Sequence, residues 1–149
     1  IHVDGKIIDV IPTSQLDLEE KYYQKIPYEN PKISIDNLKE DYFGKIFGTR
    51  SGDKGGCANL GVWAKSQEAY SFLFDFLTVK KLKELLPDLE KFEIDRFELP
   101  NIYSLNFYVH GILQDGVSSS TRMDGQAKSL GEYLRAKKIN FPEQLLKQI

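Results

Sequence analysis

Near the centre of the sequence stands the segment Arg50-Ser51-Gly52-Asp53-Lys54-Gly55-Gly56. On either side of it lie the segments Tyr42–Thr49 and Ala58–Ala64, which are rich in aromatic and aliphatic residues typical of strands. The glycines free the backbone for a tight reversal of direction. We therefore predict a β-hairpin over Tyr42–Ala64 whose tip is Ser51–Gly56.

The sequence after this hairpin predicts two helical regions and two more strands. Ser66 is a candidate helix cap, and the apolar spacing from Tyr70 onward predicts a helix, or a broken pair of helices, over residues 66–86 that Pro87 ends. Residues 92–99 and 104–113 read as strands with a short connection. A final helix is expected where Ala127, Leu130 and Leu134 recur at helical spacing, with Asp124 as its cap.

The resulting order is β-β-α-β-β-α, which favours antiparallel pairing and helices on one face of the sheet. We predict an α+β fold, a two-layer sandwich with a ferredoxin-like antiparallel sheet, over residues 41–149. Residues 1–40 are predicted to be an extension or linker from a preceding domain, with strand-like sequence in 1–11 around Asp4-Gly5 and a short helix near 16–23. Residues 135–149 are expected to form a tail with apolar side chains that can pack.

Composition excludes several classes of protein. Hydrophobic residues make up 41% and charged residues 28% of the 149 positions. A chain of this composition can bury a core, and the composition differs from that of disordered chains. A net charge of −2 with no basic stripe argues against nucleic acid or an anionic membrane as a partner. Cys57 has no second cysteine to pair with, and no signal-peptide or membrane-spanning pattern occurs, so we expect a cytoplasmic protein.

The glycine-rich segment has the chemistry of an anion site. Arg50 and Lys54 supply cations, Ser51 supplies a hydroxyl, and the glycines, including Gly55 and Gly56, can expose backbone N–H groups. The spacing differs from that of a P-loop, and a strand rather than a helix follows. The alternative is a structural hairpin in which Asp53 pairs with Lys54 or Arg50 and stiffens the turn.

Two motifs carry a resemblance to a known family. The first motif is Arg50 to Gly56 followed by Ala58-Asn59-Leu60-Gly61-Val62, and the second is Leu99-Pro100 with the later Asn106-Phe107 and Val109-His110-Gly111. With these motifs the chain resembles the AtuA-like (acyclic terpene utilisation) family over roughly residues 43–135. The matching part of that family is a ferredoxin-fold domain that follows a large domain. The resemblance implies catabolism of acyclic terpenoids and branched acids as coenzyme A thioesters. It transfers no catalytic residue, and Cys57 stands where the family often has Asp or Asn.

A second group of candidate residues lies on the predicted strands. Alternation puts Asn106 and His110 on one face of the later strand, and Asn59 lies on the corresponding face of the earlier one. If the two strands are neighbours, Asn59, Asn106 and His110 become candidate ligand-binding residues. The alternative for His110 is a hydrogen-bonded structural histidine. A catalytic Cys57 would need His110 as its base, and the sequence contains no metal-binding cluster and identifies no cofactor.

Residues 115–124 are rich in hydroxyl groups just before the last helix. Such residues commonly cap a helix start, and the alternative is an anion site with Arg122 as the counter-charge. The aromatic residues between Tyr70 and Phe76 exceed what one stripe of a helix can bury, which favours contact with another domain or subunit.

Two functions remain open at this point. In the first, the chain is the accessory domain of an AtuA-like enzyme, and segment 50–56 borders a site for an acyl-CoA or other acidic small molecule, shared with the preceding domain of the same polypeptide or with a neighbouring subunit. In the second, it is a non-catalytic assembly domain of a homo-oligomer. The residues leave open whether the domain itself is catalytic. The position of segment 50–56 distinguishes the two.

Overall fold

The computed structural model describes residues 2–7 and 28–147. At its start, β1 (His2–Val3) and β2 (Lys6–Ile7) form a small antiparallel hairpin. Asp4 and Gly5 turn the chain there with φ of 48° and 76°, as the Asp-Gly sequence predicts. The helix expected near residues 16–23, and the rest of the predicted strand material after Ile7, lie outside the described residues.

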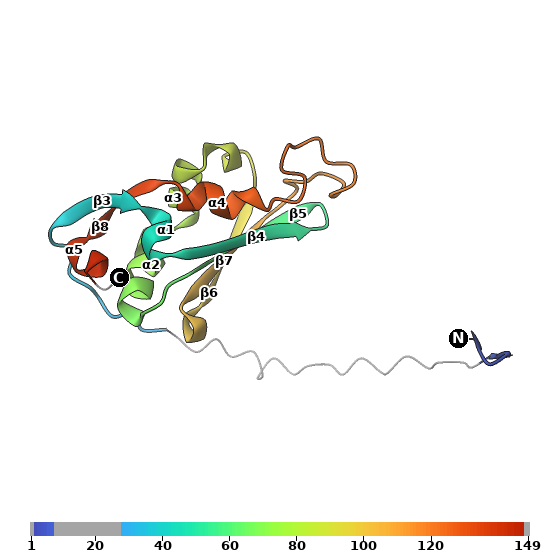
Figure 1. The fold of residues 1–149 in the computed structure, drawn as a ribbon, viewed down its shortest axis with the longest axis horizontal. Helices are drawn as coiled ribbons and strands as arrows, with labels where there is room; N and C mark the ends of the chain where they lie inside the picture. The colour runs from blue at the N-terminus through green and yellow to red at the C-terminus, as the bar shows by residue number, and fades with distance from the viewer. Residues whose placement is uncertain (1, 8–27, 148–149) are drawn as a thin grey trace.

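The main sheet has four antiparallel strands (Figure 1). Their order in the sheet is β4 (Gly48–Lys54), β5 (Cys57–Trp63), β7 (Ser104–Val109) and β6 (Ile94–Leu99). Strand β5 is connected to β6 through α2 (Gln67–Phe76), α3 (Val79–Leu85) and the 3-10 turn η2 (Pro87–Leu89). The 3-10 turn η3 (Pro100–Ile102) connects β6 to β7, and α4 (Ser129–Arg135) follows β7. This arrangement confirms the predicted α+β fold with an antiparallel sheet.

One face of the sheet packs against the helices and forms the core. The side chains of this face alternate with exposed ones, and Leu60, Leu105 and Phe107 are fully buried. Helix α2 begins where the sequence predicts it, because Ser66 Oγ accepts the Ala69 N–H at 3.2 Å. Arg96 on the same face of β6 covers the end of α2 by donating to the Phe74 carbonyl at 2.7 Å.

The predicted strand over Tyr42–Thr49 is wrong in its first half. Residues Phe43–Ile46 form the single helical turn α1, and β4 begins at Gly48. The turn places Phe43, Ile46 and Phe47 on one side, and all three are buried, which a flat strand would not allow. Strand β4 then continues to Lys54, so the predicted loop is reduced to the two-residue turn Gly55-Gly56.

A second sheet joins segments that are far apart in sequence. Strand β3 (Leu38–Tyr42) pairs antiparallel with β8 (Lys138–Pro142), and α5 (Glu143–Leu146) follows. The predicted domain boundary after residue 40 therefore falls within β3, and the predicted tail contains a strand. Tyr28 also packs on the domain, with its ring centroid 5.4 Å from that of Tyr70.

Candidate functional site

The face of the main sheet that points away from the helices, which we call the open face, has a regular order. The backbone register sets four rows across it, running from β4 through β5 and β7 to β6. The first row contains Gly48, Trp63, Ser104 and Leu99, and the second contains Arg50, Gly61, Asn106 and Phe97. The third row contains Gly52, Asn59, Tyr108 and Asp95. In the last row Lys54 lies opposite Cys57, with His110 beyond. Each of these residues is exposed or partly exposed.

The large apolar side chains of the open face lie in the first two rows, where Arg50 and Asn106 of the second row are the charged and amide exceptions. Trp63, Phe97 and Leu99 are 40%, 51% and 41% exposed, respectively. The indole of Trp63 lies over Gly48, because a Cβ on that glycine would stand 2.1 Å from Trp63 Cε2. Large apolar side chains gathered on one exposed surface are typical of a contact site.

Polar side chains continue from the second row through the other two rows. Asn59 Nδ2 donates to Asn106 Oδ1 at 3.3 Å, so the two predicted amides do meet across β5 and β7. His110 turns instead toward β6, where its Nε2 lies 2.8 Å from Asp95 Oδ2. The Tyr108 ring stands edge-on to the imidazole, with centroids 4.9 Å apart. A hydrogen bond with the Cys57 side chain, and then partial burial, raise the pKa of the Tyr108 hydroxyl.

Strand alternation divides the predicted anion-binding segment between the two faces of the sheet. Arg50 and Lys54 lie on the open face, and Ser51 and Asp53 lie on the helix face. Lys54 Nζ donates to the backbone carbonyl of Asp53 at 2.9 Å, and the Asp53 carboxylate forms no ion pair with Lys54 or Arg50. Within residues 2–7 and 28–147, the Arg50 guanidinium has no hydrogen-bond or ion-pair partner. The predicted stiffening of the turn by Asp53 is therefore not what the structure contains.

Ser51 has a structural role that the sequence did not reveal. Its Oγ donates to the Lys128 carbonyl at 3.1 Å and accepts the Gly131 N–H at 2.9 Å. These two bonds satisfy backbone groups at the start of α4 and attach that helix to β4.

The glycine turn packs on the loop that follows β7. Gly55 has a φ of +62°, the left-handed region that favours glycine. The Gly56 carbonyl accepts the Leu113 N–H at 2.9 Å, and a Cβ on Gly56 would lie 2.1 Å from the Gln114 carbonyl oxygen. Because the close approach is to backbone, this turn acts as a support for the long loop between β7 and α4.

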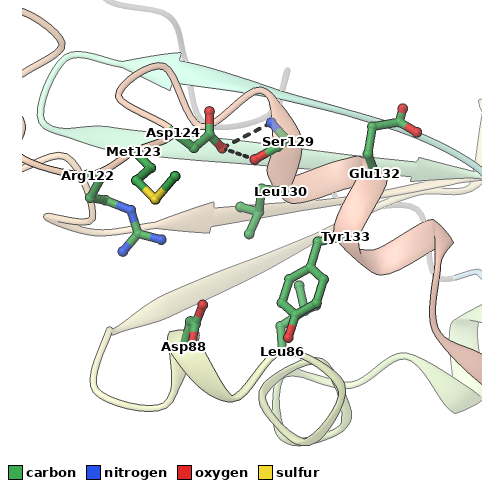
Figure 2. Close-up of a pocket in the computed structure, with 9 residues that line it drawn as sticks. All are labelled: Leu86, Asp88, Arg122, Met123, Asp124, Ser129, Leu130, Glu132 and Tyr133. Carbon is green, nitrogen blue, oxygen red and sulfur yellow. Dashed lines mark hydrogen bonds between the residues drawn. The ribbon is translucent and has the colours of Figure 1, made fainter.

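That loop forms one wall of a cavity on the helix side of the sheet (Figure 2). The cavity has a volume of about 590 Å³. Its lining residues come from the loop, from α4 and from the region of η2, and they are Leu86, Asp88, Arg122, Met123, Asp124, Ser129, Leu130, Glu132 and Tyr133. Asp124 accepts the Lys128 and Ser129 N–H groups at 2.8 and 3.0 Å. The helix begins only at Ser129, however, with Lys128 as its N-cap residue, so Asp124 holds the start of α4 from the preceding loop and is not the N-cap that the sequence predicts. The sequence pointed to Arg122 but gave no local signal for Asp88 or Tyr133.

The described residues contain no group of three or more His, Cys, Asp or Glu side chains arranged to hold a metal ion. Over the same residues, no helix has the length and apolar character that crossing a bilayer requires.

A family model described as the AtuA ferredoxin-like domain matches residues 43–140. This chain belongs to the AtuA ferredoxin-like domain family. The match runs from α1 into β8, so the AtuA ferredoxin-like domain includes the whole four-stranded sheet and both faces described above. The resemblance seen in the sequence is thereby confirmed. No curated protein and no solved structure gave a match.

Proposed function

We propose that this chain is the accessory domain of an AtuA-like protein in the catabolism of acyclic terpenoid or branched acyl-CoA compounds. In this proposal its open face borders a site for an acidic ligand, and the preceding domain of the same polypeptide or a neighbouring subunit supplies the opposite wall. The protein would act in the cytoplasm. Membership of the AtuA ferredoxin-like domain family supports the proposal, and so does the arrangement of cations on the open face.

The observation that carries the proposal is the position of Arg50. Its side chain is exposed on the open face, and both the next residue along that face of β4, Gly52, and its cross-strand neighbour, Gly61, lack side chains. A guanidinium in such a setting can reach a carboxylate or phosphate with two parallel hydrogen bonds. Lys54 lies four residues further along β4, about 13 Å away at the usual rise of a strand. Two cations at this spacing suit a ligand with more than one acidic group.

The remaining polar groups fit a binding role better than a catalytic one. The Asn59–Asn106 pair lies in adjacent rows and offers further amide donors and acceptors to a ligand. His110 is held by Asp95 at the far end of the open face and is 41% exposed. We assign no chemical step to these side chains.

The test is a binding measurement on the polypeptide that carries this domain. We expect Arg50→Gln to weaken the binding of coenzyme A and of a branched acyl-CoA by tenfold or more in calorimetry, because one charge-assisted contact is lost. Lys39→Gln, at an exposed cation on β3, serves as the matched control and should leave affinity unchanged. Unchanged affinity in folded Arg50→Gln protein would contradict the proposal.

One observation favours the alternative of an assembly domain. Strand β6 pairs with β7 on one side, and the described part of the chain supplies no strand on its other side. The His110 N–H donates to the Glu93 carbonyl, so odd-numbered residues turn their backbone groups toward β7 and even-numbered residues toward the outer edge. A second copy can therefore pair there with Phe97 opposite Phe97. In that register Arg96 of each copy faces Glu98 of the other.

Sedimentation analysis distinguishes this alternative from the first proposal. If β6 edges join two copies, Phe97→Lys should convert a dimer to a monomer, because the two introduced cations would meet at the two-fold axis. Leu99→Lys, one row away, is the matched control and should have a smaller effect. A wild-type protein that is monomeric at all concentrations would exclude the assembly role and leave the ligand-binding proposal untouched.

A further inference from the structure

The cavity beside α4 lies on the other side of the sheet from the open face and is independent of the proposed function. Its volume of about 590 Å³ falls in the range of sites for small molecules. Leu86 and Leu130 are buried and form apolar parts of its lining, whereas Met123 is fully exposed and Tyr133 is 41% exposed. A ligand with an apolar body would remove the Met123 and Tyr133 side chains from water.

The charged side chains around the cavity fall into two groups. Asp124 is occupied by the start of α4, where it also accepts the Ser129 hydroxyl at 2.7 Å, and Glu132 lies 3.5 Å from Arg135. Arg122 and Asp88 are different, because neither side chain has a hydrogen-bond or ion-pair partner within residues 2–7 and 28–147. The Arg122 side chain extends from the loop toward the side of the cavity where Asp88 lies (Figure 2).

These two groups restrict the chemistry of a ligand. Arg122 is partly buried as a residue, and its guanidinium can bind a carboxylate through two hydrogen bonds. A simple acid, however, would face the carboxylates of Asp88 and Glu132, and a simple amine would face Arg122. A molecule with both a carboxylate and an ammonium group satisfies Arg122 and Asp88 at once.

We infer that this cavity is a binding site for a small zwitterion with an apolar side chain, that is, a free apolar α-amino acid. The carboxylate contacts Arg122, the ammonium contacts Asp88, and the side chain packs among Leu86, Leu130 and Met123. An aromatic side chain gains further contacts with the Met123 thioether and the Tyr133 ring.

Two residues of the segment Arg50–Gly56, Ser51 and Gly56, support the walls of this cavity without lining it. Ser51 fixes the start of α4, which carries Leu130 and Tyr133. Gly56 supports the loop that leads to Arg122 through its contact with Gln114 and its hydrogen bond from Leu113. Both are positioning residues, since neither lines the cavity.

The first test uses ligand analogues on the unaltered 149-residue chain. L-phenylalanine and L-leucine are titrated by NMR, alongside 3-phenylpropanoate, which lacks the ammonium, and 2-phenylethylamine, which lacks the carboxylate. We expect each analogue to bind about tenfold or more weakly than L-phenylalanine, because each forfeits one charge-assisted contact. Absence of saturable binding by both amino acids, or equal affinity for L-phenylalanine and either analogue, overturns the inference.

The second test uses variants of the same chain. Arg122→Gln and Asp88→Asn should each lower affinity for L-phenylalanine by about tenfold, and Arg122→Lys should have a smaller effect because it keeps the charge without the paired donors. In the Arg122→Gln variant, L-phenylalanine should also bind no more tightly than 2-phenylethylamine. A merely structural role of Arg122 would not produce this change in relative affinity. Lys39→Gln and Glu68→Gln, at exposed charges that do not line the cavity, are the controls. Equal affinity in both site variants and both controls overturns the inference.

Discussion

Replacing Gly56 by alanine tests whether the glycine turn is a support for the loop after β7. The new Cβ would lie 2.1 Å from the Gln114 carbonyl oxygen, which is backbone and cannot rotate away. The turn and the loop must separate, and the 2.9 Å hydrogen bond from the Leu113 N–H to the Gly56 carbonyl is strained or lost. Overpacking of this kind costs about 1–3 kcal/mol, and the hydrogen bond adds about 1 kcal/mol. We therefore expect Gly56→Ala to lower the free energy of unfolding by roughly 2–4 kcal/mol.

Urea denaturation followed by circular dichroism measures this free energy, and a thermal melt should show a fall in Tm of roughly 5–15 °C for a chain of this size. Gly52→Ala is the matched control, since it changes a glycine of the same hairpin where an added Cβ has no neighbour within 4 Å. That substitution should be neutral or stabilise by up to about 1 kcal/mol through reduced freedom of the unfolded chain. If Gly56→Ala is as stable as Gly52→Ala, the turn does not support the loop and our reasoning fails.

Three further predictions follow from single contacts. Ser51→Ala leaves the Gly131 N–H without its acceptor and should lower the free energy of unfolding by about 1–3 kcal/mol, whereas Ser51→Thr, which keeps the hydroxyl, should recover part of it. Gly48→Ala should displace the indole of Trp63, the only tryptophan, and shift its fluorescence emission, with an unchanged spectrum counting against the contact. Burial raises the pKa of the Tyr70 hydroxyl from 10.0 to about 12, so the native state holds this proton more tightly than the unfolded chain does. The free energy of unfolding should therefore be unaffected by this group below pH 10 and should fall as the pH rises toward 12. Tyr70→Phe should remove that fall from unfolding curves measured at alkaline pH. The substitution should not lower the free energy of unfolding at pH 7, because the described residues offer the hydroxyl no hydrogen-bond partner.

The parts of the fold set by local periodicity were predictable from the sequence. Alternation along residues 104–109 assigned Phe107 to the core and Asn106 to the opposite face, and both assignments are confirmed. Ser66 and Pro87 marked the start of α2 and the end of α3 for the reasons that capping and ring geometry give. Two separate helices, α2 and α3, are one of the two alternatives that the sequence left open for residues 66–86.

The failures arose where tertiary contacts override local preference. Residues Phe43–Ile46 have strand-like composition, but burying Phe43 and Ile46 on one side requires a helical turn, and their three-residue spacing was the available signal. Strand β4 extends to Lys54 because its partner β5 is present to pair with it, so Gly52 lies within the ladder and only Gly55 and Gly56 form the turn. The pairing of β3 with β8 leaves no local trace, since each strand is short and the partner lies about 100 residues away.

The candidate site shows the same division between local and distant information. The sequence identified Arg50, Asn59, Asn106 and His110, and the meeting of the two amides followed correctly from strand alternation. It could not show that alternation sends Ser51 to the opposite face, because the strand boundary had been placed too early. Of the cavity beside α4, the sequence indicated only Arg122 and the loop before the helix. The walls of the cavity come from segments that approach one another only after the helices pack on the sheet.

The pairing of β3 with β8 has a consequence for the order in which the chain can fold during translation. The ribosome makes β3 before any strand of the four-stranded sheet, yet its partner β8 is the last strand that the structure describes. A nascent chain that has reached only Lys137 therefore holds all four strands of the main sheet but lacks Phe141, which is fully buried in the finished core. Until β8 has been synthesised, the edge of β3 that pairs with it is unpaired, and chaperones or other nascent chains can bind there. Closing so long a loop also slows folding, so the domain is completed late, by a step that joins its two ends.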